Sequence, residues 1–128
     1  MNRTIKFRGK SVKDDEWISS NRFWTNVHLW NINDVPVQPD TVGQSTDLYD
    51  KNGKEMYEGD IVKFYYMESL PYSTKLTPSP VLFGKIALNK YNQWAIFSKG
   101  LEIHIDYAIL YGEIVGNIYD NPDHVELK

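Results

Sequence analysis

The feature that most constrains the fold of this chain is a polar turn followed by a strongly β-prone run. Residues 50–54 contain the pair Asn52-Gly53, which readily supplies the positive φ angles of a tight hairpin turn. Gly59-Asp60 then leads into residues 61–66, IVKFYY, which are rich in β-branched and aromatic side chains. We therefore expect the hairpin of residues 48–64 to organise the fold, with these core or interface residues: Ile61, Val62 and Phe64.

Alternation of apolar and polar residues predicts further strands. Residues 3–8 alternate cations with apolar side chains, so one face of that strand should be buried. Residues 22–30, RFWTNVHLW, would as a single strand place Trp24 and Trp30 on one face and large apolar groups on the other. Because aromatic side chains are costly to leave bare, such a strand is covered by another segment or lies at an interface. Residues 81–88 and 93–97 predict a second hairpin around Asn89 to Asn92.

The remaining segments complete an expected single domain over residues 1–128. Residues 31–46, with two prolines and little periodicity, predict an extended connector, and residues 67–80, rich in Pro, Ser and Thr, an exposed loop. Residues 101–110 fit either a strand or a short helix, and residues 113–119 read as a strand. The expected fold is mainly β with little helix: an N-terminal β segment (1–30), the connector, and a small SH3-like or partly open barrel (47–128).

Composition excludes several classes of protein. The 128 residues include no cysteine, which rules out a disulfide scaffold, a thiolate zinc site, an iron–sulfur cluster and a thiol nucleophile. No apolar run approaches the roughly 20 residues that cross a bilayer, and the N-terminal residues lack the apolar core of a signal peptide. The expected location is therefore the cytoplasm.

The net charge of -3 is unevenly distributed along the chain. Residues 1–13 carry five cations and no acid, whereas residues 101–128 carry six acids against Lys128. Opposite charges could bring the two ends together within the chain or between subunits, or the basic end could bind phosphates. Exposed positions on edge strands would produce the same pattern.

Motifs for catalysis or metal binding are absent. The three histidines, at 28, 104 and 124, show no zinc-ligand spacing. No Gly-x-Ser-x-Gly elbow or phosphate-binding glycine loop occurs. We predict no catalytic, cofactor-binding or metal-binding residue.

A group of acids in the centre of the chain needs separate consideration: Asp47, Asp50, Glu55, Glu58 and Asp60. They could hold a cation or act as a general acid and base, although the calcium-loop spacing is missing. Asp50 and Asp60 flank turns, where a short carboxylate accepts backbone N–H bonds, and we favour this structural role. A hydrolase that uses Glu55, Glu58 and Asp60 is the less favoured alternative.

Basic and aromatic residues suggest a binding surface for nucleic acid or for another protein chain. Small β-barrels bind nucleic acids by stacking bases on aromatic rings while cations contact phosphates. The negative net charge and loose spacing weigh against this function, because such mixtures also occur on ordinary sheets. The residues that could form the surface are Trp24, Trp30, Lys63, Tyr65, Lys85, Lys90, Tyr91 and Trp94.

Four segments in order resemble the YopX family of phage and prophage proteins. They are IKFRGK (5–10), EWI (16–18), PDTVGQSTDLYDKNGKEMYEGDIVKF (39–64) and EIVGNIYDNPD (113–123). The resemblance implies a mainly β fold and a family without an established biochemical activity, so it assigns no catalytic residue. The recurring positions instead coincide with expected structural turns: Asn52, Gly53, Gly59, Asp60, Gly116 and Asn117.

The chain departs from the usual pattern of this family at three positions in the centre. Ser45 stands where an aromatic residue is usual, Asp47 where glycine is usual, and Tyr49 where lysine is usual. Because Asp tolerates the left-handed backbone conformation better than most residues, the turn at position 47 can survive. Residues 65–112 have no counterpart that we can align with the pattern.

These observations lead to an expected function. The resemblance, the aromatic residues of segment 22–30 and the opposite charges of the termini indicate a non-enzymatic phage or prophage accessory protein that acts by binding, in the cytoplasm of the bacterial host. Self-association as a homo-oligomer is expected, with an unidentified phage or host protein as a further partner and with no cofactor or membrane contact. Nucleic-acid binding is the alternative.

Overall fold

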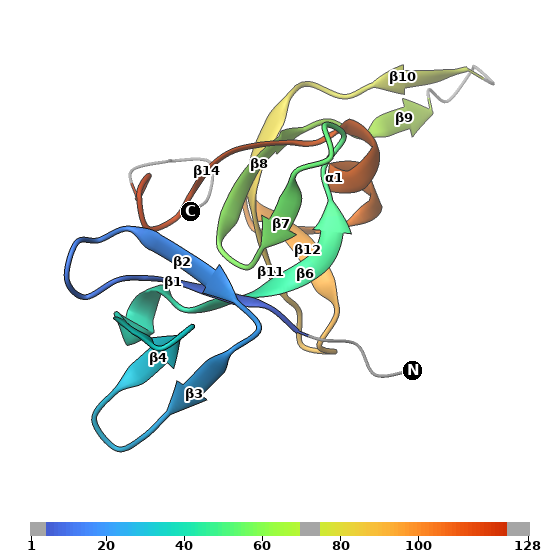
Figure 1. Cartoon of the computed structure of the whole chain (residues 1–128). Helices are drawn as coiled ribbons and strands as arrows, with labels where there is room; N and C mark the ends of the chain where they lie inside the picture. Colours follow the sequence, from blue (N-terminus) through green and yellow to red (C-terminus); the bar gives the residue numbers. More distant parts are fainter. Residues whose placement is uncertain (1–4, 70–74, 123–128) are drawn as a thin grey trace. The chain divides into compact units, whose positions relative to one another are not determined.

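The computed structural model describes residues 5–69 and 75–122 and divides into two compact units, residues 1–47 and 48–128 (Figure 1). Antiparallel strands predominate in both units, and the α-helical content of the described residues is one six-residue helix. The predicted mainly β class with little helix is therefore confirmed. None of the described helices is long and apolar enough to cross a membrane.

The first unit is built from short strands around a small apolar core. Its elements are β1 (Phe7–Lys10), β2 (Trp17–Ser20), β3 (Phe23–Thr25), β4 (Trp30–Ile32), β5 (Val35–Val37) and the 3-10 turn η1 (Pro39–Thr41). Strands β3, β4 and β5 form an antiparallel sheet in that order, and β1 pairs with β2. Ile32 and Val37 are buried, and a Cβ at Gly9 would lie 3.2 Å from the side chain of each. Glycine at position 9 therefore lets β1 pack closely on this core.

Strand β6 (Gly43–Tyr49) carries the chain from one unit into the other. Gly43 and Gln44 pair with β1 in the first unit. Asp47 has φ 61°, so the expected left-handed conformation at this position is confirmed.

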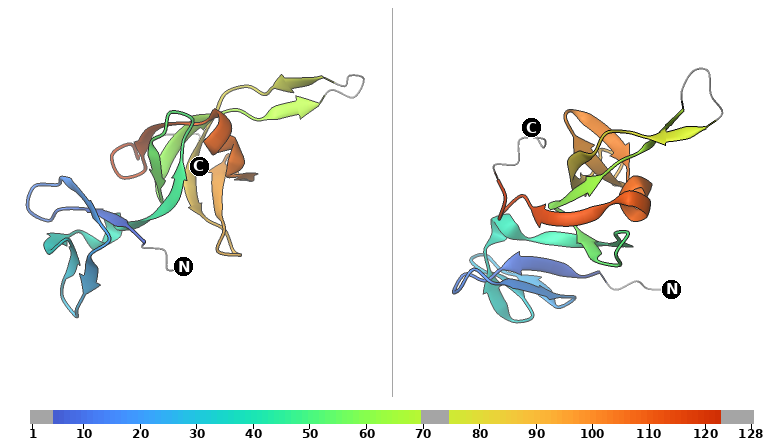
Figure 2. Two further views of the ribbon diagram at one scale, coloured as in Figure 1. Left: turned by 45° about the vertical axis from the view of Figure 1, so that its right-hand side comes forward. Right: turned by 90° about the horizontal axis from the view of Figure 1, so that it is seen from above.

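The second unit contains a five-stranded antiparallel sheet of order β13-β12-β11-β8-β14. Its elements are β7 (Glu55–Tyr57), β8 (Asp60–Phe64), β9 (Met67–Ser69), β10 (Leu76–Pro78), β11 (Leu82–Leu88), β12 (Trp94–Ser98), β13 (Leu101–His104), α1 (Asp106–Tyr111) and β14 (Glu113–Asn117). Strands β9 and β10 pair separately and extend from this unit as an arm (Figure 2). Segment 101–110, whose sequence fits either a strand or a short helix, contains strand β13 and all of helix α1 except its last residue.

The core of the second unit lies on one face of this sheet, where helix α1 also packs. The predicted burial of Ile61, Val62 and Phe64 is confirmed, since each is at most 1% exposed. The buried residues of the core cluster are Met56, Val62, Phe64, Ile86, Ile96, Ile105, Ala108 and Ile114.

Two turns agree with the sequence analysis. The Asp50 N–H donates to the Lys54 carbonyl at 2.9 Å, and Gly53 has φ 82°, which closes the predicted turn before β7. The second predicted hairpin joins β11 to β12, with Asn92 at φ 61°. The hairpin predicted to extend to Phe64 is shorter, because β8 pairs with β11 and β14.

The prediction of one continuous strand over residues 22–30 is wrong. The Asn26 side-chain oxygen accepts hydrogen bonds from the N–H groups of His28 and Leu29, at 2.9 and 2.7 Å. This Asx turn folds the segment into the β3–β4 hairpin, in which Thr25 pairs with Trp30. Trp24 and Trp30 consequently lie on opposite faces of the hairpin, because Trp24 is the neighbour of Thr25.

Two segments predicted to be irregular contain strands. Residues 31–46 hold β5 and parts of β4 and β6, and Pro36 takes a central position in β5. Residues 67–80 contain the β9–β10 pair, while residues 70–74 of the predicted loop lie outside the described residues. Three-residue strands escape recognition because they are too short to show alternation.

Candidate binding surfaces

Two acids of the central segment, Asp50 and Asp60, hold turns. Asp50 is buried, and its Oδ1 accepts hydrogen bonds from the N–H groups of Asn52 and Lys54, both at 2.9 Å. Its Oδ2 accepts from the N–H of Ile114 at 3.0 Å. Buried Asp60 accepts from the N–H of Tyr57 at 2.7 Å. These bonds give both carboxylates a structural role in the backbone.

The other predicted turn residues are also placed by backbone geometry. Gly59 has φ 90°, and a Cβ there would lie 3.1 Å from the ring of Tyr119. A Cβ at Gly116 would lie 2.9 Å from Asn121 Cγ, next to a bulge between β14 and β8. Asn117 Oδ1 accepts hydrogen bonds from the N–H groups of Tyr119 and Asp120, at 3.0 and 2.9 Å. All six recurring positions thus lie at turns or close backbone contacts.

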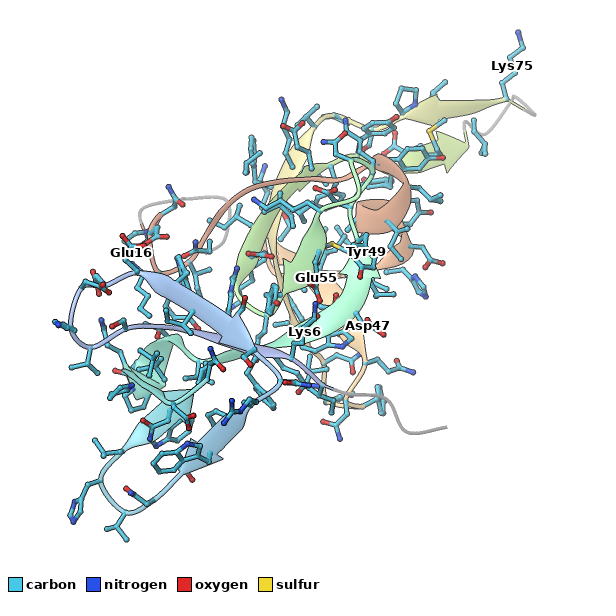
Figure 3. The ribbon with its side chains drawn as sticks, in the orientation of Figure 1. Lys6, Glu16, Asp47, Tyr49, Glu55 and Lys75 are labelled. Carbon is cyan, nitrogen blue, oxygen red and sulfur yellow. The ribbon has the colours of Figure 1, made fainter. Side chains whose placement is uncertain are left out.

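The histidines and acids show no metal centre. Among residues 5–69 and 75–122, no group of three or more His, Asp or Glu side chains could hold a metal ion. His28 lies in the exposed β3–β4 turn and His104 at the end of β13, while His124 lies outside the described range. Glu55 lies on β7 (Figure 3).

The predicted basic and aromatic residues do not form one surface. Lys63 on β8 pairs with Phe83 on β11, so the two side chains lie on the same face of the sheet. Lys85 lies two residues after Phe83 on β11 and therefore shares this face. Trp94 pairs with Leu88. Because Leu88 is three residues from Lys85 on the same strand, Trp94 and Lys85 lie on opposite faces of the sheet, and Trp94 packs against the core. Lys90 and Tyr91 occupy the β11–β12 turn, where the Lys90 ammonium lies 5.1 Å from the Tyr91 ring centroid.

The β3–β4 hairpin exposes an apolar surface in the first unit. The side chain of Val27 is 92% exposed at its tip, and those of Trp24 and Leu29 are 44% and 45% exposed. On one face the Trp30 ring contacts Phe23 edge-on at 5.7 Å. On the other face the Trp24 indole N–H donates to Asp34 at 3.1 Å, and Asp34 also pairs with Arg22 at 3.0 Å. Both tryptophans are therefore oriented while part of each ring stays accessible.

A cation and tryptophan cluster lies on β1 and β2 of the same unit. The Arg8 guanidinium is 4.6 Å from the Trp17 ring centroid, and the Lys10 ammonium is 5.6 Å away. Sequence reasoning noted these cations but not their contact with Trp17. The alternating cations of residues 3–8 and the nearby EWI segment are the signal that could have indicated it.

A cluster of four tyrosines lies in the second unit. Tyr65, which was expected on the predicted surface, stacks on Tyr111 at 4.6 Å, and Tyr111 stacks on Tyr107 at 6.3 Å. Tyr66 contacts Tyr107 edge-on at 6.2 Å. Sequence reasoning missed the cluster, although the spacing of four between Tyr107 and Tyr111 places both on one side of a helix.

The phenol of Tyr66, one member of this cluster, has a raised pKa. Its hydroxyl is hydrogen-bonded to the Glu68 carboxylate, whose charge also opposes formation of the phenolate. Together with a smaller effect of desolvation, these interactions raise the pKa of Tyr66 above its ordinary value of 10.0. The phenol is therefore a neutral donor under ordinary conditions.

A groove borders the tyrosine cluster, between the β9–β10 arm and helix α1. It has a volume of about 410 Å³, and its lining includes Met67, Leu76, His104, Asp106, Tyr107 and Leu110. The walls are mainly apolar, and the lining includes one carboxylate. Such a surface can take an apolar chain with a polar or charged end.

The fold and these surfaces describe a mainly β protein whose recurring polar residues shape turns and whose tryptophans at 24 and 30 are partly accessible. Residues 2–126 match the family described as YopX protein, and the chain belongs to this family. It is similar in structure to protein EF1440 from Enterococcus faecalis, with a TM-score of 0.51 and 22% sequence identity. That similarity covers 95% of this chain and 98% of the other, and it shows the shared fold. No curated protein matches the chain.

Proposed function

We propose that this member of the YopX family is a non-enzymatic accessory protein of a phage or prophage. It acts by binding, in the cytoplasm of the bacterial host, and it self-associates through the β3–β4 hairpin. The observation that carries the proposal is the accessible apolar surface of that hairpin, to which Val27 and Trp24 contribute. The structural roles of Asp50 and Asp60 support a function without catalysis, since their carboxylates already bind backbone N–H groups.

The hairpin has the properties of an edge that another chain can extend. Strand β3 is the outer strand of the order β3-β4-β5. Residues 23–33, FWTNVHLWNIN, contain no Lys, Arg, Asp or Glu, the charges by which edge strands commonly avoid association. The hydrogen bonds Asn26 N–H to Leu29 and Asn33 N–H to Arg22 imply that Trp24 also bonds to β4. The backbone groups of Phe23 and Thr25 then point toward the open edge of this sheet.

A second copy of the chain is the simplest partner for this edge. Two β3 strands related by a twofold axis would pair antiparallel and would bury both copies of the same apolar residues. Such an interface is self-complementary, because each copy contributes the same strand and the same apolar residues. Neutral hairpins also approach each other without the repulsion that two identical charged edges would produce.

Light scattering or sedimentation measures the predicted association. The wild-type chain should have the mass of a dimer or larger at concentrations of about 10–100 µM. Val27→Glu should shift the mass toward the monomer, because it places a charge at the tip of the apolar surface. Val12→Glu is the matched control, since Val12 is 62% exposed in the same unit but lies outside the hairpin. A monomeric wild-type chain throughout that range would refute self-association.

A further variant tests whether the edge strands pair. Thr25→Pro removes an N–H group that points toward the open edge, and it leaves the inferred bond between Trp24 and β4 in place. We expect it to reduce association about as strongly as Val27→Glu, with an unchanged circular dichroism spectrum. Association that persists in Thr25→Pro but not in Val27→Glu would mean that side chains alone form the interface.

Nucleic-acid binding is a second candidate, favoured by the contact of Arg8 and Lys10 with Trp17. A short single-stranded oligonucleotide labelled with a fluorophore should then bind at low salt, with an affinity that falls steeply as salt rises. Replacement of both cations by glutamine should weaken binding and reduce the salt dependence. An unchanged fluorescence anisotropy at low salt would exclude this candidate.

A further inference from the structure

The groove beside helix α1 combines an uncovered apolar wall with aromatic rings. Leu76 on β10 and Leu110 on α1 are both lining residues and are 59% and 60% exposed. Met67 adds a flexible thioether side chain to the same lining. Apolar side chains exposed beside a concave surface mark a place where another apolar group can be buried.

The aromatic part of the groove is held in position by its neighbours. Tyr107 and Tyr111 line the groove and lie on the same helix, with ring centroids 6.3 Å apart. Tyr65 stacks on Tyr111, and Tyr66 contacts Tyr107 edge-on. Because these contacts limit the movement of both rings, little ordering is needed when a ligand binds.

The lining of the groove includes one carboxylate, that of Asp106. The Asp106 N–H lies 3.1 Å from His104 Nδ1, at the start of α1. The Asp106 carboxylate lies 3.5 Å from the same nitrogen and its side chain is 65% exposed. Most of this carboxylate is therefore accessible to a ligand. Lys75 lies at the far end of the β9–β10 arm, directed away from α1 (Figure 3).

We propose that this groove binds a lysine or arginine side chain of a partner protein, flanked in the partner by aliphatic residues. The cationic group would contact the Tyr107 and Tyr111 rings and the Asp106 carboxylate, which are the two kinds of group that attract organic cations. The aliphatic neighbours would cover Leu76 and Leu110. This proposal concerns the second unit and does not depend on self-association through the β3–β4 hairpin.

The distribution of charge favours a protein segment over a free polyamine. A polyamine carries ammonium groups at both ends, whereas Asp106 is the single carboxylate among the lining residues described. A second ammonium group would therefore lie against Leu76 or Leu110 and would lose hydration without a partner. A peptide with one cation and aliphatic neighbours matches both parts of the groove.

The first test uses the full chain and three probes in titrations followed by amide NMR spectra. The probes are a capped peptide Ile-Lys-Leu, the same peptide with norleucine in place of lysine, and spermidine. We expect the lysine peptide to shift the signals of α1 and β10 and to bind at least about fivefold more tightly than the norleucine peptide. Equal binding of the two peptides, or no saturable shift, would overturn the proposal, and tighter binding of spermidine would replace the protein partner by a polyamine.

The second test uses variants with matched controls on β13. Asp106→Asn should weaken the lysine peptide at least about fivefold and leave the norleucine peptide unchanged, whereas Glu102→Gln should affect neither. Leu110→Ser should weaken both peptides, with Leu101→Ser as its control, because Leu101 is equally exposed at 59% and lies outside the groove lining. An Asp106→Asn variant that binds like the wild type would overturn the role of the carboxylate.

Discussion

The Asp50 carboxylate accepts a hydrogen bond from the N–H of Ile114, a residue 64 positions further along the chain. Its other oxygen accepts from Asn52 and Lys54 in the turn before β7. One buried side chain therefore both shapes a local turn and fixes the start of β14. This double role explains why an acid at this position need not be catalytic.

Asp50→Ala should destabilise the second unit strongly. The substitution leaves the buried Ile114 N–H without its acceptor and removes both turn bonds, for an expected loss of about 3 kcal/mol in the free energy of unfolding. Urea denaturation followed by circular dichroism measures this loss. Glu102→Gln, which removes a negative charge from an exposed side chain of the same unit, should change stability by less than about 0.5 kcal/mol. Similar stabilities for the two variants would contradict the anchoring role of Asp50.

The left-handed backbone at Asp47 leads to a second prediction. Asp47→Val should cost about 1–2 kcal/mol, because a β-branched residue tolerates a φ of 61° poorly, whereas Asp47→Gly should be neutral or gain up to about 1 kcal/mol. Tyr49→Val on the same strand is the control for the change in side chain, since Tyr49 is exposed and does not have a positive φ. Thermal unfolding compares the variants. An Asp47→Val variant as stable as Tyr49→Val would show that the strain is absent.

Two glycines of the second unit should respond differently to alanine. A Cβ at Gly84 would lie 2.5 Å from Ile96 Cγ2 and 2.9 Å from the Phe97 carbonyl oxygen, so Gly84→Ala requires β11 and β12 to separate. At Gly53 nothing lies within 4 Å, and the only penalty comes from its φ of 82°. We expect losses of about 2–3 kcal/mol for Gly84→Ala and about 1 kcal/mol for Gly53→Ala. Denaturant midpoints in the reverse order would contradict this account.

Local chemistry explains which elements could be predicted from the sequence. Asn52-Gly53 and Asn89 to Asn92 carry their turn geometry in their own side chains and φ preferences, and both turns are present. The prediction of a single strand over residues 22–30 was wrong because the alternation of side chains continues past Asn26, whose side chain closes a turn. A single Asn within an apolar run does not interrupt the alternation that predicts a strand, so the alternation does not reveal an Asx turn.

The surfaces were harder to predict than the turns. Lys85 and Trp94 are both on the β11–β12 hairpin, yet the pairing of Trp94 with Leu88 places them on opposite faces. The register between strands decides this, and sequence spacing does not reveal it. The tyrosine cluster likewise depends on the packing of α1 beside the end of β8, which brings Tyr65 onto Tyr111. Tertiary contacts of this kind are not encoded in any local pattern.

The hydrogen bond between Tyr66 and Glu68 predicts a late-titrating phenol. Because the folded chain holds this proton more tightly than the unfolded chain, the contribution to stability is complete below pH 10.0 and is lost as pH rises through the higher pKa of the folded state. Carbon NMR of labelled tyrosine follows each phenol, and Tyr66→Phe identifies the signal. Glu68→Gln should return the pKa of Tyr66 toward its ordinary value, whereas Glu102→Gln should leave it unchanged. A Tyr66 signal that titrates at the ordinary value of 10.0 in the wild type would show that Glu68 does not hold the phenol.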